Sequence, residues 1–68
     1  MYYVKLVELR MRFCPVCKIM VLHECGSLLH QMEDDGVMIP MFTVYECLGC
    51  GYLYDQNGLI FQKEYKKL

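Results

Sequence analysis

The chain has 68 residues, of which 56% are apolar and 22% charged, and its formal net charge is −1. This length allows one domain, residues 1–68, and such a short domain commonly needs a metal, disulfides or a second chain to stabilise its core. A charge so near zero differs from the basic surface of a dedicated nucleic-acid binder. The opening segment carries Lys5, Glu8 and Arg10, which argues against a signal peptide, and no apolar run is long enough to span a membrane. We therefore expect a cytoplasmic protein that does not enter the membrane.

The first predicted element is a strand over residues 2–13, YYVKLVELRMRF. Apart from Lys5 its odd positions are apolar, whereas its even positions change from apolar, at Tyr2, Val4 and Leu6, to charged. Alternation with a period of two predicts a strand. Because residues 2–6 are apolar on both faces, we expect both to be covered, either within the chain or by a partner strand.

Two more strands are predicted at residues 18–25 and 37–46. Residues 26–36 between them are expected to form a loop or a distorted hairpin, because the EDDG at 33–36 is typical of a turn. Pro40 has no backbone donor and predicts an edge position or a bulge in the third strand.

The last predicted element is a hairpin over residues 52–65. It is expected to turn at Asn57-Gly58, a pair suited to a type I′ turn. The basic tail, residues 63–68, is expected to fray or to form a short helical turn.

Four of the five cysteines form two Cys-x-x-Cys pairs, in FCPVCK and ECLGCGY. Zinc in structural sites prefers four such ligands in a tetrahedron, and two tight turns on different hairpins supply them. Residues 18–46 are long enough to form a hairpin between the pairs. A thioredoxin-like role would need a βαβ setting, which the sequence does not predict. We expect one structural Zn²⁺ per chain, held by Cys14, Cys17, Cys47 and Cys50.

With these motifs, residues 13–53 resemble the zinc ribbon, a small all-β fold of two cysteine knuckles and antiparallel hairpins, here with an additional N-terminal strand. The resemblance implies structural zinc on the four cysteines. Zinc ribbons occur in RNA polymerase subunits, transcription elongation factors, ribosomal proteins and the toxin-binding domain of one type of antitoxin, so the resemblance implies no single function.

Part of the chain is also similar to rubredoxins, which carry iron on four cysteines. CGYLYDQNG is similar to their first knuckle and CPVC to their second, although the order is reversed and the chain has no tryptophan. Both differences favour zinc, and iron stays the alternative because thiolates bind both metals.

The remaining cysteine and the histidines have structural interpretations. Cys25 alternates with Ile19, Val21 and His23, so we expect a buried thiol, the alternative being a ligand role together with His23. His30 is expected to be solvated. The acids at 33–35 are read as a solvated turn, or alternatively as a contact to a basic partner.

We expect no enzyme, because a four-thiolate site leaves no open position for substrate and no phosphate-binding loop is present. The preferred hypothesis is a small regulatory protein or subunit that docks, without catalysis, on a larger protein or transcription-type machine. A homodimer through residues 2–6 is one form of this hypothesis. The residues expected to contact a partner are Tyr2, Val4, Leu6, Arg10, Arg12, Tyr52, Tyr54 and Phe61.

Two alternatives remain open. The first is nucleic-acid binding, with aromatic side chains stacking on bases and two groups of cations, Lys5, Arg10, Arg12 and Lys18 and then Lys63, Lys66 and Lys67. The second is an iron electron carrier.

Overall fold

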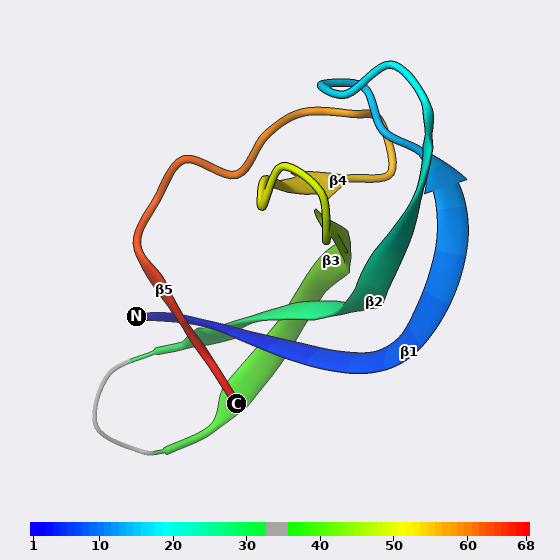
Figure 1. The fold of residues 1–68 in the computed structure, drawn as a ribbon. Helices are drawn as coiled ribbons and strands as arrows, with labels where there is room; N and C mark the ends of the chain where they lie inside the picture. Colours follow the sequence, from blue (N-terminus) through cyan, green and yellow to red (C-terminus); the bar gives the residue numbers. More distant parts are fainter. Residues whose placement is uncertain (33–35) are drawn as a thin grey trace.

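Five strands form one strongly curled sheet in the computed structural model, which describes residues 1–32 and 36–68 (Figure 1). The strands are β1 (Tyr2–Phe13), β2 (Met20–Gln31), β3 (Met38–Cys47), β4 (Leu53–Asp55) and β5 (Tyr65–Lys67). Their order across the sheet is β4-β3-β2-β1-β5, and all neighbours are antiparallel except β5, which runs parallel to β1. The predicted small all-β fold is confirmed. The expected acidic turn at 33–35 lies outside the described residues.

A β-bulge at Val7 divides β1 into two halves. Leu6 pairs with Gly26 and Glu8 pairs with Cys25, so Val7 is an extra residue in β1. Such an insertion moves the following side chains to the opposite face. The odd apolar positions after the bulge therefore share a face with Val4 and Leu6 before it. This explains why the apolar positions of the sequence change parity within one strand.

The bulge needs a glycine on the facing strand. A Cβ atom at Gly26 would overlap the carbonyl oxygen of Lys5 and lie against the backbone of Leu6. Only glycine allows the two backbones to approach this closely. Gly26 therefore lies inside a continuous strand, where a loop or a distorted hairpin over 26–36 was predicted, and β2 extends to Gln31. The loop alternative was wrong because the glycine accommodates a bulge in the neighbouring strand. The hairpin alternative agrees with the antiparallel pairing of residues 26–31 with β3, which a bulge interrupts.

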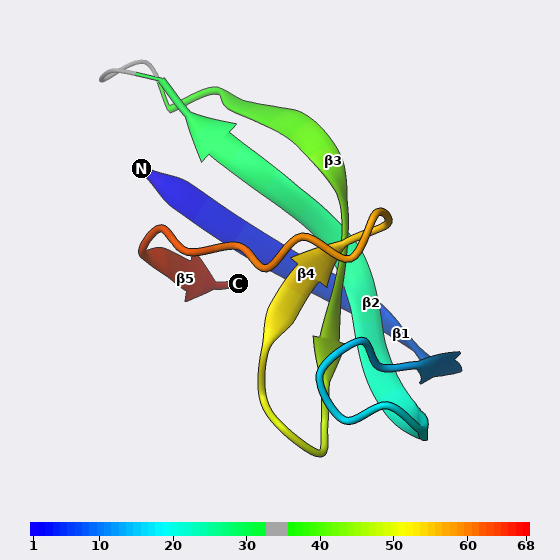
Figure 2. The ribbon, with the colours of Figure 1, turned by 90° about the horizontal axis from the view of Figure 1, so that it is seen from above.

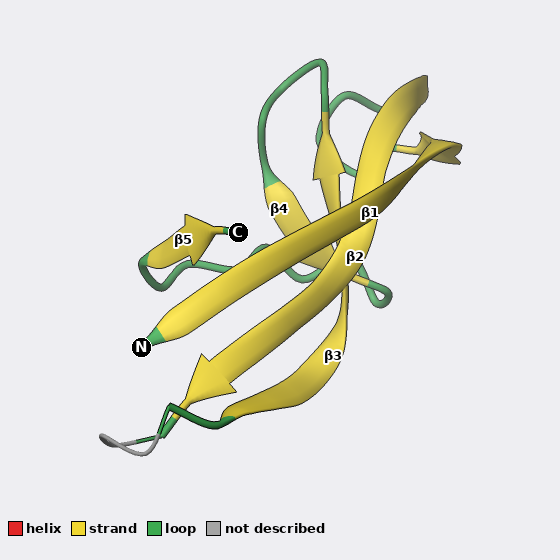
Figure 3. Cartoon of the chain, turned by 90° about the horizontal axis from the view of Figure 1, so that it is seen from below, coloured by secondary structure: helices red, strands yellow, loops and turns green. Residues whose placement is uncertain are grey.

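The core is built from one residue of each of the four strands β1 to β4: Val4, Leu28, Val44 and Leu53. Tyr2, Leu6, Phe61 and Tyr65 pack against it. Figure 2 shows the segment between β4 and β5 crossing β1 and β2, and Figure 3 shows β1 and β2 from the side where no segment crosses them.

The predicted hairpin over 52–65 is wrong in its turn type and in its length. A type I′ turn at Asn57-Gly58 needs a positive φ at both residues, and only Gly58 has one. The Gly58 N–H donates to the Asp55 carbonyl at 3.0 Å, so the turn centres on Gln56 and Asn57 instead.

Tyr54 makes a single bridge to Ile60, and the Phe61 N–H donates to the Leu53 carbonyl at 2.8 Å. The chain then leaves β4, and Tyr2 to Val4 of β1 pair with β5 instead. Burial of the Phe61 and Tyr65 rings against the core favours this path over a longer hairpin. The tail that was expected to fray or to form a short helical turn therefore contains a strand, β5.

Pro40 lies at a second bulge, as the sequence predicted. Leu28 pairs with Phe42 and Leu29 with Pro40, so Met41 is the extra residue of β3. The outer edge of β3 meets β4 only from Val44 onwards.

Candidate metal centre

The sulfur atoms of Cys14, Cys17, Cys47 and Cys50 lie within 4.8 Å of one another. The Sγ atoms of Cys14 and Cys50 are 3.7 Å apart, and those of Cys17 and Cys47 are 3.8 Å apart. A tetrahedron with Zn–S bonds near 2.3 Å has S···S edges of about 3.8 Å. The four side chains therefore fit a tetrahedral metal ion, and the same arrangement suits zinc or iron.

The two Cys-x-x-Cys turns repeat one backbone pattern, although their sequences differ. Cys14 N–H donates to the Ile19 carbonyl at 2.9 Å, and Cys47 N–H donates to the Tyr52 carbonyl at 3.0 Å. Within the turns, Lys18 N–H donates to Cys14 and Gly51 N–H to Cys47, both at 2.8 Å. Each turn thus closes on itself at the end of a strand, which holds its sulfurs on one side.

Backbone amides also point at the sulfurs. Cys17 N–H donates to Cys14 Sγ at 3.3 Å, while Gly49 N–H and Cys50 N–H donate to Cys47 Sγ at 3.3 and 3.4 Å. Burial raises the pKa of Cys47, but hydrogen bonds from the amides of Cys50 and Gly49, together with those from the Cys50 and Cys14 side chains, outweigh it and lower that pKa to about 7. Amides aimed in this way stabilise a thiolate, which is the form that binds metal.

The pKa of the neighbouring Cys17 thiol is shifted in the opposite direction. Burial raises the pKa of Cys17 to about 12, and hydrogen bonds with Cys50, Cys14 and Cys47 contribute to the rise. The protein alone therefore favours one thiolate in the cluster and resists the next. A divalent cation supplies the positive charge that would let the remaining thiols ionise.

The second knuckle also leaves no room beside the sulfurs. A Cβ at Gly49 would lie 3.3 Å from Val21 Cγ1 and 3.6 Å from Cys47 Sγ. The small residue in the middle of the second pair therefore lets that turn pack against β2.

His23 and Cys25 do not join the sulfur cluster. His23 is fully buried, with Nδ1 2.7 Å from the Val21 carbonyl and Nε2 2.7 Å from the Tyr54 hydroxyl. A carbonyl can only accept, so Nδ1 carries the hydrogen and Nε2 accepts from the hydroxyl. Both nitrogens are thus occupied by the protein, which leaves neither for a metal. Cys25 is buried as expected, and burial raises its pKa.

The residues expected to contact a partner are scattered. Val4 and Tyr54 are 0% and 1% exposed, so the fold itself removes them from the surface, which corrects that expectation. Tyr2, Leu6 and Phe61 pack on the core, and among the eight residues Tyr52 is a well exposed aromatic. The alternating pattern did not show that residues 2–4 are paired on both sides, by β2 and by β5.

Several cations are engaged within the chain. Arg10 pairs with Glu8 at 3.0 Å, the guanidinium of Arg12 lies 3.7 Å from the centre of the Tyr45 ring, and Lys67 pairs with Glu46 at 2.7 Å. The Glu46 carboxylate raises the pKa of Lys67. These pairings were not predicted. The Arg12–Tyr45 and Lys67–Glu46 pairs join residues that are distant in the sequence. Glu8 and Arg10 are close in the sequence, but charged residues are common on any surface and do not by themselves predict an ion pair.

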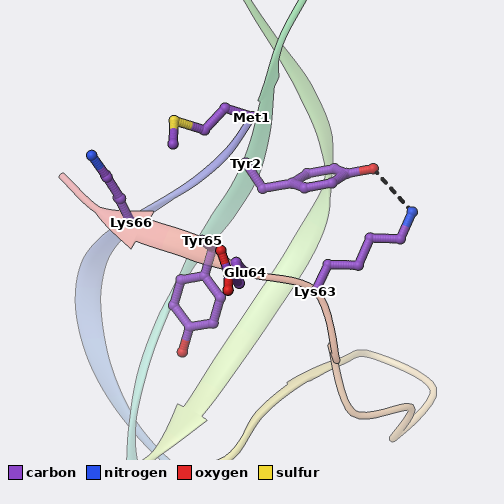
Figure 4. A pocket seen from close by; sticks show the side chains of 6 residues that line it. All are labelled: Met1, Tyr2, Lys63, Glu64, Tyr65 and Lys66. Atoms are coloured by element: carbon purple, nitrogen blue, oxygen red, sulfur yellow. Dashed lines mark hydrogen bonds between the residues drawn. The ribbon is translucent and has the colours of Figure 1, made fainter.

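A pocket of about 510 Å³ lies beside β5 and is lined by Met1, Tyr2, Lys63, Glu64, Tyr65 and Lys66 (Figure 4). Lys63 reaches the Tyr2 hydroxyl at 3.5 Å, whereas Lys66 points away from it on the far side of the pocket. The two lysines do not converge on one point, so they do not form a cradle for a phosphate group.

His30, expected to be solvated, stacks on the Tyr2 ring with the ring centres 4.7 Å apart.

No family model, curated protein or solved structure matches this chain. Among the described residues there is no apolar helix of membrane-spanning length. The chain shows a four-cysteine cluster that has the geometry of a metal site. The cluster lies at one end of a small curled β-sheet.

Proposed function

We propose that this chain is a noncatalytic interaction module, stabilised by one structural zinc ion, that docks on a larger protein or transcription-type machine in a reducing compartment. The observation that carries the proposal is the four-sulfur cluster. One pair of its cysteines lies between β1 and β2, and the other lies at the junction of β3 and β4. An ion there would tie together two turns that are 30 residues apart in the chain.

The cluster supports a structural role because the protein supplies all four ligands. A catalytic zinc keeps one position for water or substrate, and a Cys₄ site does not. For a chain with a core of four buried aliphatic side chains, the binding free energy of such an ion is a large part of the folding free energy.

Protein docking is favoured over nucleic-acid binding by what the surface offers. Arg10, Arg12 and Lys67 are held by partners within the chain, whereas large apolar side chains of β1 and β2 are exposed. Phosphate binding depends on free cations, and apolar surface of this kind is typical of a protein contact.

The experiment is metal analysis of the purified protein with its visible absorption spectrum. We expect one zinc per chain and no colour in the wild type and in Cys25→Ser, and loss of the metal in Cys47→Ser. The Cys25→Ser variant is the matched control, since it removes a thiol outside the cluster. Iron with strong visible absorption would replace the proposal with an electron carrier, and metal-free folded protein would refute the structural zinc.

Nucleic-acid binding is tested on the same samples. We expect no binding of the zinc-loaded protein to single- or double-stranded DNA or RNA at physiological salt. Tight binding that weakens steeply as salt rises would contradict protein docking as the main role.

A further inference from the structure

The second half of β1 has a free backbone edge. β5 pairs only with Tyr2 to Val4, and no described segment forms backbone hydrogen bonds with the outer edge of residues 8–13. An unpaired strand edge is a template for another strand.

The other described edges of the sheet are protected. Along the free part of β3, Pro40 has no N–H and Met41 bulges out of the ladder. Segment 59–61 covers β4, through the Tyr54–Ile60 bridge and the hydrogen bond from Phe61 to Leu53. The three-residue β5 carries two lysines, which is a common way to discourage pairing. Residues 8–13 contain neither a proline nor a bulge.

An apolar stripe lies along this free edge. It consists of side chains that are between 40% and 60% exposed: Leu9, Met11 and Phe13 of β1 and Met20 and Leu22 of β2. Met11 is opposite Leu22 and Phe13 is opposite Met20, so the stripe is continuous across both strands on one face. Exposed apolar side chains gathered at an open edge mark an interaction site.

We propose that a second copy of this chain pairs antiparallel with residues 8–10 of β1, on a twofold axis at Leu9, so that the seam stops short of the bulged Val7. This inference goes beyond the proposed docking on a larger protein and adds self-association to the zinc-stabilised module. The charges on the opposite face of the strand favour it. Glu8 and Arg10 are paired within one chain at 3.0 Å. With Leu9 opposite Leu9 of the other copy, each Glu8 also lies opposite an Arg10 of that copy, so the four groups alternate in sign and no like charges meet.

The other alignments are worse. A parallel pairing sets Glu8 against Glu8 and Arg10 against Arg10. Shifting the antiparallel register by two residues sets either Glu8 or Arg10 opposite itself. In the second case two Glu8–Arg12 pairs form as well, but the pair of facing arginines offsets part of their gain. A further shift in that direction sets Arg10 opposite Arg12. A one-residue slip would place the apolar side chains of the two copies on opposite faces.

A seam of three residues a side is short, so the dimer is expected to be weak and to depend on concentration. Cross-strand charge pairs contribute modestly, and like charges directly opposite are unfavourable by a similar amount. A single substitution that reverses one charge changes both symmetry-related pairs from opposite to like charges. We therefore expect it to weaken association by about tenfold.

The test is sedimentation equilibrium of the zinc-loaded protein and its charge variants. We expect the wild type to move towards the mass of two 8.1 kDa chains as its concentration rises. Glu8→Arg alone and Arg10→Glu alone should each associate about tenfold less well, because each sets like charges opposite. Mixing the two variants should restore association. In the mixed dimer the introduced arginine of one chain faces the introduced glutamate of the other, and the unchanged Arg10 faces the unchanged Glu8.

A second pair of variants tests the stripe. Met11→Lys should abolish association, whereas Met41→Lys, the same change on the protected edge of β3, should leave it intact. Zinc content and circular dichroism of every sample check the fold.

A zinc-loaded wild type that stays monomeric would overturn the dimer and leave the proposed function standing. Dimers that survive both Glu8→Arg and Met11→Lys would overturn this interface. A folded wild type that holds no metal would refute the proposed function separately.

Discussion

Lys18 and Gly51 occupy equivalent positions in the two knuckles. Each follows the second cysteine of its pair, donates its N–H to the carbonyl of the first cysteine at 2.8 Å, and has a positive φ, 64° for Lys18 and 81° for Gly51. The turn thus requires a left-handed residue after each pair, and one of the two knuckles supplies it with a lysine.

Replacing that lysine should stabilise the protein. A left-handed conformation costs a non-glycine residue about 1 kcal/mol, part of which glycine loses again through its greater freedom when unfolded. We expect Lys18→Gly to raise the free energy of unfolding by about 0.5 kcal/mol. Urea unfolding of the zinc-loaded protein measures this change. Lys18→Ala is the control and should bring no gain, because alanine is equally strained there.

Gly26→Ala should strongly destabilise the fold. The new methyl group would overlap the Lys5 carbonyl in the backbone of β1, which has no side-chain freedom with which to move away. We expect a loss of about 3 kcal/mol or more in the free energy of unfolding. Ser27→Ala, one residue along β2, is the control. A Gly26→Ala protein as stable as this control would contradict the tight approach at the bulge.

Tyr54→Phe removes the hydroxyl that donates to His23 Nε2. The imidazole nitrogen would then be buried without a partner, which costs about 1–3 kcal/mol. Because neither residue contacts the metal through these atoms, we expect one zinc per chain to be retained. Thermal unfolding together with metal analysis checks both points. Tyr52→Phe, on an exposed ring, should change stability by less than about 0.5 kcal/mol.

Zinc affinity should depend on pH with a slope that changes near pH 7. Zinc binds thiolates, so every thiol that is protonated in the free protein releases a proton on binding. The pKa of Cys47 is lowered to about 7, so its thiolate is already formed above that pH, and below it binding must displace one more proton. The affinity should therefore fall more steeply below pH 7, where the slope of its logarithm against pH should be larger by about one, for the one additional proton released. Competition with a chromophoric chelator measures the slope, and equal slopes on both sides would contradict the lowered pKa.

The metal centre was the part most accessible from the sequence. The spacing within each Cys-x-x-Cys pair is a local feature that determines where two sulfurs point, and residues 18–46 are long enough for a hairpin. The parity change between Leu6 and Leu9 was equally visible and is the signature of the bulge. It was not recognised, because a single bulged residue gives no signal apart from that change.

The pairings made by the end of the chain could not be predicted. β5 joins β1 across more than 60 residues, in a parallel arrangement that no short pattern specifies. Burial of Phe61 and Tyr65 decides it, and this depends on where the core lies. The contact between His23 and Tyr54 likewise requires the complete register of β2, β3 and β4.

The most direct test of the central claim is thermal unfolding of the zinc-loaded protein before and after removal of the metal by a strong chelator. If the ion stabilises this fold, removal should abolish the cooperative transition and the β-sheet circular dichroism, and added zinc should restore both. A protein that keeps its sheet and its melting temperature without metal would show that the four cysteines are not a structural metal site.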